Sequence, residues 1–265
     1  MLTSRGFNAM AERQHWPERL WLIRHGQSQG NVARDLAHEA GHSVIDLDLR
    51  DVDVPLSELG HSQAEATGRW FAALPEHEKP EVLLASPYVR ARQTAEAICK
   101  AGGLAGGSKP TVLDERLRER EFGVFDGLTT IGIREKYPEE AAHRAKMGKF
   151  YHRPPGGESW ADVILRLRSM LNTINLHYAD KRVAVVAHQV VVLCMRYILD
   201  ELTEGQILAI DKQAEILNCG ICAYDFEPNH LSLCVPKLVL WNHGAPMEQE
   251  GTPKTAEPDA MTGSR

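Results

Sequence analysis

The chain has 265 residues, of which 43% are hydrophobic and 25% charged, and its formal net charge is −6 at pH 7. These values are typical of a soluble globular protein and argue against nucleic acid or an anionic membrane as the main partner. An anionic substrate would therefore need a local cationic pocket to bind it.

Apolar runs typical of buried strands alternate with helical patterns along the chain. This alternation predicts an α/β fold, a three-layer α/β/α sandwich whose central sheet is mostly parallel with an antiparallel edge strand. The predicted strands are residues 20–23, 82–85, 111–113, 183–187, 221–226 and 231–240. The last two, joined by residues 227–230, are expected to pair as an antiparallel hairpin at the edge.

Two predicted helices are defined by their first residues. Ser57 is expected to cap a helix that reaches about residue 74, and Ser159 with Asp162 three residues later forms a predicted capping box for another. The second helix carries one apolar stripe, which we assign to the core. The stripe consists of Val163, Leu167, Leu171 and Ile174.

These elements predict one domain over residues 17–243, with flexible tails at residues 1–16 and 244–265, where large apolar side chains are scarce. The longest apolar stretch, residues 183–195, is interrupted by a histidine and a glutamine and is too short to cross a bilayer. Residues 1–5 lack the apolar segment of a secretory signal. We therefore expect a cytoplasmic protein.

The five cysteines are an odd number in apolar surroundings, which favours reduced and mostly buried thiols. Cys219 and Cys222 have the spacing of a redox or zinc motif, but no second Cys or His pair accompanies them at ligand spacing. We therefore expect no bound metal and no cofactor.

Two histidines follow predicted strands of the sheet. Arg24 and then His25 follow the first strand, and His188 follows the fourth strand. Because parallel strands end at the same edge of a sheet, both imidazoles should meet there. A histidine in this position either is a satisfied end-of-strand residue or attacks a phosphoryl group held by guanidinium and backbone donors.

An arginine and two glutamates follow the remaining parallel strands. Arg90 lies in the first turn of the helix expected after residues 82–85, where it can clamp a phosphate at the same edge, whereas Arg92 lies on another side of that helix. Glu119 and Glu121 come after the strand at 111–113, and either could be merely solvated.

Six short blocks between residues 24 and 189 occur in a recognisable order. The blocks are Arg24-His25-Gly26 with Ser28 and Asn31; Pro55-Leu56-Ser57 with Gly60 and Gln63-Ala64; Ser86-Pro87 with Arg90-Ala91 and Gln93-Thr94-Ala95; Leu117 with Glu119 and Phe122-Gly123; Gly157-Glu158-Ser159; and Ala187-His188-Gln189. Together they resemble the histidine phosphatase superfamily, the phosphoglycerate-mutase-like proteins. The resemblance implies a phosphoric monoester hydrolase that acts on a small phosphorylated metabolite.

The resemblance also implies a role for each matching residue. His25 matches the nucleophile that becomes phosphorylated, and His188 is a further catalytic residue that contacts the phosphoryl group. The residues matched to substrate-phosphate binding are Arg24, Asn31, Arg90, Ser28 and Gln189. These positive or polarising groups can stabilise phosphoryl transfer without a metal ion, and the neighbouring arginines should lower the pKa of His25 so that its lone pair stays available.

Glu119 matches the proton donor, with Glu121 as its rival two residues on. A carboxyl group that faces an anionic ester in a partly dry pocket should have a raised pKa, which would hold the proton for the leaving alkoxide.

Within the superfamily, residues 149–159 and the Ala-His-Gln block at His188 resemble the fructose-2,6-bisphosphatase-like branch. That resemblance makes Lys149 and Arg153 candidates for contact with a distal substrate phosphate, and it favours a sugar phosphate or bisphosphate as substrate. The chain departs from the branch in having no nucleotide-binding kinase half.

Two alternatives stay open, and a third is disfavoured. A cofactor-dependent phosphoglycerate mutase would return the phosphate from the histidine to a second hydroxyl, and a non-catalytic module would bind a phospho-ligand or a protein. Asp51 and Asp53 mimic the aspartate pair of magnesium-dependent haloacid-dehalogenase phosphatases, but a polar segment precedes them instead of a buried strand, so we expect a solvated loop. The oligomeric state is also open, a homodimer included.

Overall fold

The computed structural model describes residues 16–104, 111–213, 215–228 and 234–256. A six-stranded sheet lies at its centre, in the strand order β3-β2-β4-β1-β5-β6. The strands are β1 (Arg19–Arg24), β2 (Val82–Ala85), β3 (Val112–Leu113), β4 (Arg182–Ala187), β5 (Ile221–Pro228) and β6 (Cys234–His243). β1 to β4 pair in parallel, while β5 and β6 run antiparallel at one edge, so the predicted α/β fold with a mostly parallel sheet is confirmed.

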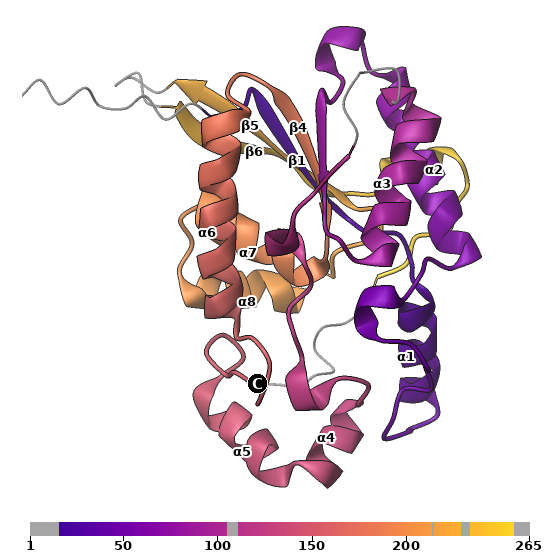
Figure 1. Ribbon diagram of the computed structural model, residues 1–265, viewed down its shortest axis with the longest axis vertical. Coiled ribbons are helices and arrows are strands. Elements are labelled where there is room, and N and C mark those ends of the chain that lie inside the picture. Colours follow the sequence, from indigo (N-terminus) through magenta and orange to yellow (C-terminus); the bar gives the residue numbers. More distant parts are fainter. Residues whose placement is uncertain (1–15, 105–110, 214, 229–233, 257–265) are drawn as a thin grey trace, which may run out of the picture.

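Helices cover both faces of the sheet (Figure 1). On one face lie α2 and α3, and on the other lie α6, α7 and α8. The helices are α1 (Gln29–Glu39), α2 (Glu58–Ala73), α3 (Val89–Gly102), α4 (Thr130–Lys136), α5 (Pro138–Met147), α6 (Trp160–His177), α7 (Gln189–Leu199), α8 (Glu204–Gln213) and α9 (Ala245–Gln249). None of these described helices is long and apolar enough to cross a membrane.

The alternation of side chains along β1 builds both layers of the core. Leu20 and Leu22 pack into the cluster that contains the buried stripe of α6, whereas Trp21 and Ile23 pack on the opposite side against α2 and α3. Successive strand residues point to opposite faces, so a strand that is apolar at every position is buried between two helical layers.

Strand register places the two predicted histidines at the same edge. Arg24 of β1 is the partner of Ala187 of β4, so His25 and His188 are the residues that follow this last pair. Figure 1 shows α1, α4 and α5 gathered beyond this edge, below the sheet. The fold therefore leaves the carboxyl edge of the parallel strands covered by three helices and their loops.

The two helix caps predicted from the sequence are present in the structure. Ser57 accepts a hydrogen bond from the Gly60 N–H at the start of α2, and Ser159 forms the predicted reciprocal capping box with Asp162 at the start of α6. Such caps satisfy N–H groups that a helix end leaves without a partner, which explains why they can be predicted locally.

One boundary differs from expectation. Residues 244–256 are not a flexible tail: α9 buries Met247 beside α2, and Thr255 donates its hydroxyl proton to Asn218 Oδ1 over 2.9 Å. One buried methionine and a few hydrogen bonds dock this polar segment. Strand β6 is described from Cys234, and residues 229–233 of the predicted hairpin lie outside the described residues, as do 1–15 and 257–265 of the predicted tails.

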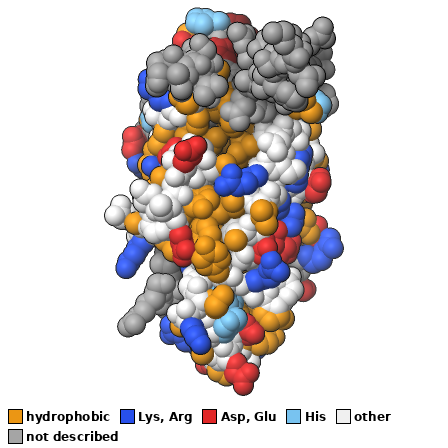
Figure 2. Space-filling model, turned by 90° about the vertical axis from the view of Figure 1, so that its left-hand side faces the viewer, with side chains coloured by type: hydrophobic (Ala, Val, Ile, Leu, Met, Phe, Trp, Pro, Cys, Tyr) orange, Lys and Arg blue, Asp and Glu red, His pale blue; other side chains and the backbone are white. Residues whose placement is uncertain are grey.

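Hydrophobic side chains also gather at the surface. Figure 2 shows them as a band on the face that lies at the left of Figure 1. On α6, Leu165 and Leu176 are among the exposed large hydrophobic residues. The homodimer considered from the sequence stays a prediction.

Candidate active site

His25 is held at the tip of β1 with its side chain buried and one ring nitrogen oriented. Its backbone N–H donates to the Ala187 carbonyl over 2.9 Å, and its Nδ1 lies 2.7 Å from the Gly26 carbonyl oxygen. Because a carbonyl oxygen can only accept, Nδ1 carries the proton and Nε2 carries the lone pair. The chain can turn so closely here because a Cβ on Gly26 would lie 2.4 Å from the Gly60 carbonyl oxygen.

His188 lies beside His25 at the tip of β4. The ring centroids are 5.2 Å apart and the rings are inclined by 63°. The Nε2 atom of His188 is 2.8 Å from the Ser86 hydroxyl, which fixes the ring in the core. Sequence reasoning did not give Ser86 this role, although its place directly after β2 was the available signal.

Arg90 projects from the first turn of α3, as predicted, and its guanidinium contacts His25. Its Nε donates to His25 Nε2 over 3.3 Å. Its Nη1 donates to the Asp51 backbone carbonyl over 2.6 Å and lies 3.0 Å from the Asp51 carboxylate. The expectation that Asp51 lies in a solvated loop is therefore wrong, because in the single-turn helix Asp51–Asp53 its carboxylate pairs with Arg90.

Arg24 and Asn31 line the same cavity from opposite ends of one loop. Arg24 is buried and donates from Nη1 to the Ile216 carbonyl. Asn31 Oδ1 accepts from the Ser28 N–H over 2.7 Å in the capping box of α1 and also lies 3.4 Å from Asn218 Nδ2. Because this oxygen accepts, Nδ2 is the part of Asn31 that can donate to an anion.

Ser28 and Gln189 complete the predicted phosphate-binding residues, and both line the cavity. The Ser28 hydroxyl accepts from the Asn31 N–H, so it caps α1. Gln189 begins α7, and its buried Oε1 has no hydrogen-bond partner among the described residues. The structure thus brings together all of the residues predicted to contact the reacting phosphate.

Glu119, and not Glu121, faces the cavity. One Glu119 oxygen accepts from the Arg120 N–H over 2.8 Å, and the other lies 3.7 Å from His188 Nδ1. Glu121 instead accepts from the Tyr88 hydroxyl over 3.0 Å, its side chain is 48% exposed, and it is not among the lining residues. The irregular backbone of this segment separates two glutamates that the sequence could not distinguish.

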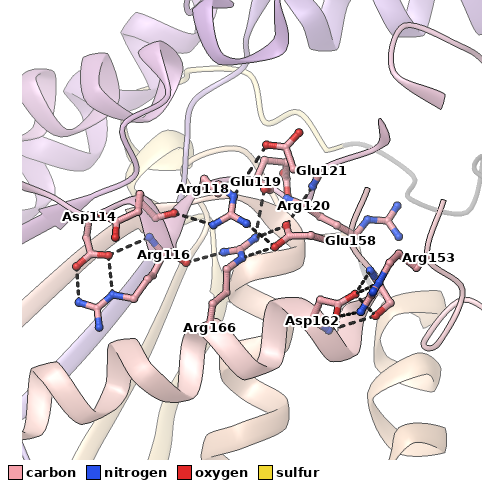
Figure 3. Close-up of polar contacts among 12 residues, drawn as sticks. Asp114, Arg116, Arg118, Glu119, Arg120, Glu121, Arg153, Glu158, Asp162 and Arg166 are labelled. Atoms are coloured by element: carbon pink, nitrogen blue, oxygen red, sulfur yellow. Dashed lines mark hydrogen bonds and ion pairs between the residues drawn. The ribbon is translucent and has the colours of Figure 1, made fainter. Parts of the chain in front are cut away.

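An ion-pair network fixes the segment that carries Glu119 (Figure 3). Glu158 accepts from Arg118 over 2.6 Å and from Arg166 over 3.0 Å, and its second oxygen accepts from the Glu121 N–H over 3.2 Å. Arg166 also donates to the Glu119 backbone carbonyl over 3.2 Å. Arg166 of α6 and Glu158, the residue before its N-cap, therefore hold the backbone on both sides of the Glu119 carboxylate.

Burial and charge shift the pKa values of the three central groups. Burial, followed by the charges of Arg90 and Arg24, lowers the pKa of His25 well below its usual value, and burial also lowers that of His188. Burial raises the pKa of Glu119 to about 7. The predicted directions for His25 and Glu119 agree, but for His25 the main cause is burial and not the neighbouring arginines.

Lys149 and Arg153 do not reach the cavity, so the structure does not support them as distal substrate contacts. Lys149 Nζ is 2.6 Å from the Asp211 carboxylate and lies over the Trp160 ring. Arg153 is exposed and pairs with Asp162 at the start of α6. Each charge is satisfied by a carboxylate on a neighbouring element, which the spacing in the sequence could not reveal.

The cavity has a volume of about 280 Å³ and holds two further arginines, Arg34 of α1 and Arg144 of α5. On α1, Arg34 lies three residues after Asn31, and His38 lies four residues after Arg34. Helical spacing was therefore the sequence signal that could have found both Arg34 and His38. Much of the remaining wall is apolar. The apolar lining residues are Ile45, Leu47, Leu49, Phe122, Phe125, Leu128, Ile133 and Val190.

Comparison with known proteins agrees with this geometry. The histidine phosphatase superfamily (branch 1) model matches residues 20–242. A 2,3-bisphosphoglycerate-dependent phosphoglycerate mutase of Sinorhizobium fredii is 33% identical over 195 residues, 72% of this chain and 84% of the relative. A 6-phosphofructo-2-kinase/fructose-2,6-bisphosphatase of Caenorhabditis elegans is 32% identical over 183 residues, 68% of this chain and 33% of the relative.

A solved structure, that of mycobacterial glucosyl-3-phosphoglycerate phosphatase, is similar as well. It has a TM-score of 0.64 and 26% sequence identity, and the match covers 85% of this chain and 98% of the other. The chain belongs to the histidine phosphatase superfamily.

Proposed function

We propose that the protein hydrolyses a phosphate monoester through a phosphohistidine at His25. The observation that carries the proposal is the arrangement around His25 Nε2. This atom holds a lone pair, Arg90 donates to it, and Arg24 and the His188 ring lie at the same strand tips. Such an arrangement suits a nucleophile that must receive a group bearing negative oxygens.

In the first step, Nε2 attacks phosphorus and forms the N–P bond as the bond from phosphorus to the ester oxygen breaks. Glu119, with its pKa of about 7, gives its proton to the departing alkoxide. In the second step, Glu119 takes a proton from water, the hydroxide oxygen bonds to phosphorus, and the N–P bond breaks. Inorganic phosphate leaves, and both residues return to their starting forms.

Guanidinium groups supply the positive charge that a metal ion provides in other phosphatases. Arg24 and Arg90 carry permanent charge and are buried, and electrostatic interactions between buried groups are stronger than in bulk solvent. We therefore expect turnover to persist in a chelator.

The substrate, in this proposal, is a small phosphorylated metabolite, such as a sugar phosphate or bisphosphate. A cavity of about 280 Å³ is small for an organic ligand. A second anionic group would contact Arg34 and Arg144 in place of the predicted Lys149 and Arg153. Arg34 lines the same cavity as His25. The expected cytoplasmic location stays a prediction.

The test is phosphate release from an aryl phosphate in EDTA, followed by a panel of phosphorylated metabolites. Activity and an acid-labile phosphoenzyme should be present in the wild type and absent in His25→Ala. His177→Ala, which removes an exposed histidine at the end of α6, is the matched control and should retain both. Release that survives in His25→Ala would refute the mechanism.

The mutase alternative is tested in the same panel. If 3-phosphoglycerate yields 2-phosphoglycerate without free phosphate, the phosphohistidine transfers to a second hydroxyl and the phosphatase proposal is wrong.

For a bisphosphate substrate, Arg34→Ala should raise KM about tenfold while KM for the aryl monophosphate changes little, because only the bisphosphate has a group to pair with Arg34.

A further inference from the structure

A cluster of two histidines and one glutamate lies outside the cavity, on the helix that forms part of its wall. Glu140 and His143 are three residues apart on α5 and share one face of the helix, and His152 follows α5 in the next loop. One ligand-type atom from each side chain can be chosen so that all three lie within 4.8 Å of one another. No role was assigned to these residues from the sequence, and the proposed reaction does not use them.

His152 is the fixed member of the cluster. Its side chain is fully buried, its ring stacks on Phe125 with centroids 6.0 Å apart, and its Nε2 is 3.4 Å from a Glu140 carboxylate oxygen. Its Nδ1 is also buried and has no hydrogen-bond partner among the described residues.

We propose that Glu140, His143 and His152 bind a zinc ion. Two ligands bonded tetrahedrally to zinc at about 2.0–2.1 Å lie about 3.4 Å apart, which matches the separation between His152 and Glu140. Two imidazoles with one carboxylate favour zinc over magnesium or calcium, which prefer oxygen ligands. His143 and Glu140 are open to solvent, so water can occupy the fourth position.

The zinc site would act on the cavity wall and not on the reacting phosphate. Arg144 follows His143 on α5 and lines the cavity, and Phe125, on which His152 stacks, lines it too. An ion that joins α5 to the loop after it would hold both side chains in place. The site is therefore structural, and the phosphohistidine chemistry does not depend on it.

The experiment is calorimetric titration of the EDTA-stripped, dialysed full chain with zinc chloride, together with thermal unfolding with and without zinc. We expect saturable binding of about one equivalent and a rise in Tm. Glu140→Gln and His143→Ala should each weaken the binding about tenfold or more, since each removes one of three protein ligands. Both residues are solvent-accessible, so these variants should fold.

Controls separate this site from the catalytic histidines, which could also attract zinc. His25→Ala and the exposed His177→Ala should bind zinc as the wild type does. Binding that disappears in His25→Ala but survives in His143→Ala would place the metal in the catalytic cavity and refute the proposal. Weak, unsaturable binding in the wild type would refute it too. All of these readouts are independent of phosphatase activity.

Discussion

Replacing Glu119 by glutamine tests the environment of the predicted proton donor. The pKa of this carboxyl is raised by burial from 4.5 to about 7 in the folded protein. Between these two values the folded chain binds a proton that the unfolded chain has released, so the free energy of unfolding must fall as pH rises. A difference of this size corresponds to about 3 kcal/mol.

Glutamine has nearly the same shape but does not titrate. The stability contributed by the raised pKa is fully present below pH 4.5 and is lost as pH rises through about 7. The free energy of unfolding of Glu119→Gln, relative to that of the wild type, should therefore increase by about 3 kcal/mol as pH rises from about 4 to about 8. The assay is urea denaturation of both proteins across this range, with the difference in unfolding free energy plotted against pH.

Glu121→Gln is the control, because this side chain is half exposed and lies outside the cavity. Only the pH dependence that Glu119→Gln shows beyond that of Glu121→Gln is assigned to the cavity. If Glu119→Gln shows no such additional dependence, Glu119 titrates as an ordinary surface carboxyl, and the reasoning about its buried environment is refuted.

The remaining predictions concern the groups that support the site. Ser86→Ala removes the hydroxyl that lies 2.8 Å from His188 Nε2. Steady-state assays should show a kcat about tenfold lower, which corresponds to about 1.4 kcal/mol. An unchanged kcat would contradict a positioning role for Ser86. Asp51→Asn removes a carboxylate that competes with phosphate for Arg90. The inhibition constant of inorganic phosphate should therefore fall about threefold to tenfold. Weaker inhibition by phosphate would show that Asp51 and phosphate do not compete for Arg90. Glu158→Gln leaves two arginines without their buried counter-charge and should lower the unfolding free energy by about 2–3 kcal/mol in denaturant titrations, whereas a neutral effect would show that the network in Figure 3 is not stabilising.

The sequence by itself determined the layered architecture and the residues at the strand tips. The unbroken apolar runs at residues 20–23 of β1 and 183–187 of β4 require burial between two layers, and the residues that follow each run must then lie at the carboxyl edge. Ser57 and Ser159 marked helix starts because a cap acts within one turn of the chain. These features depend on local sequence, so pattern and chemistry were sufficient.

Tertiary structure decided what depends on contacts between distant segments. It placed Glu119 in the cavity and Glu121 outside it, paired Lys149 with Asp211, and docked residues 244–256 on the domain. It also placed Asp51 in contact with Arg90, which lies 39 residues later in the sequence. A loop follows no periodic pattern, so the direction of its side chains is set by the surfaces on which it packs, and those exist only after the sheet and helices have assembled.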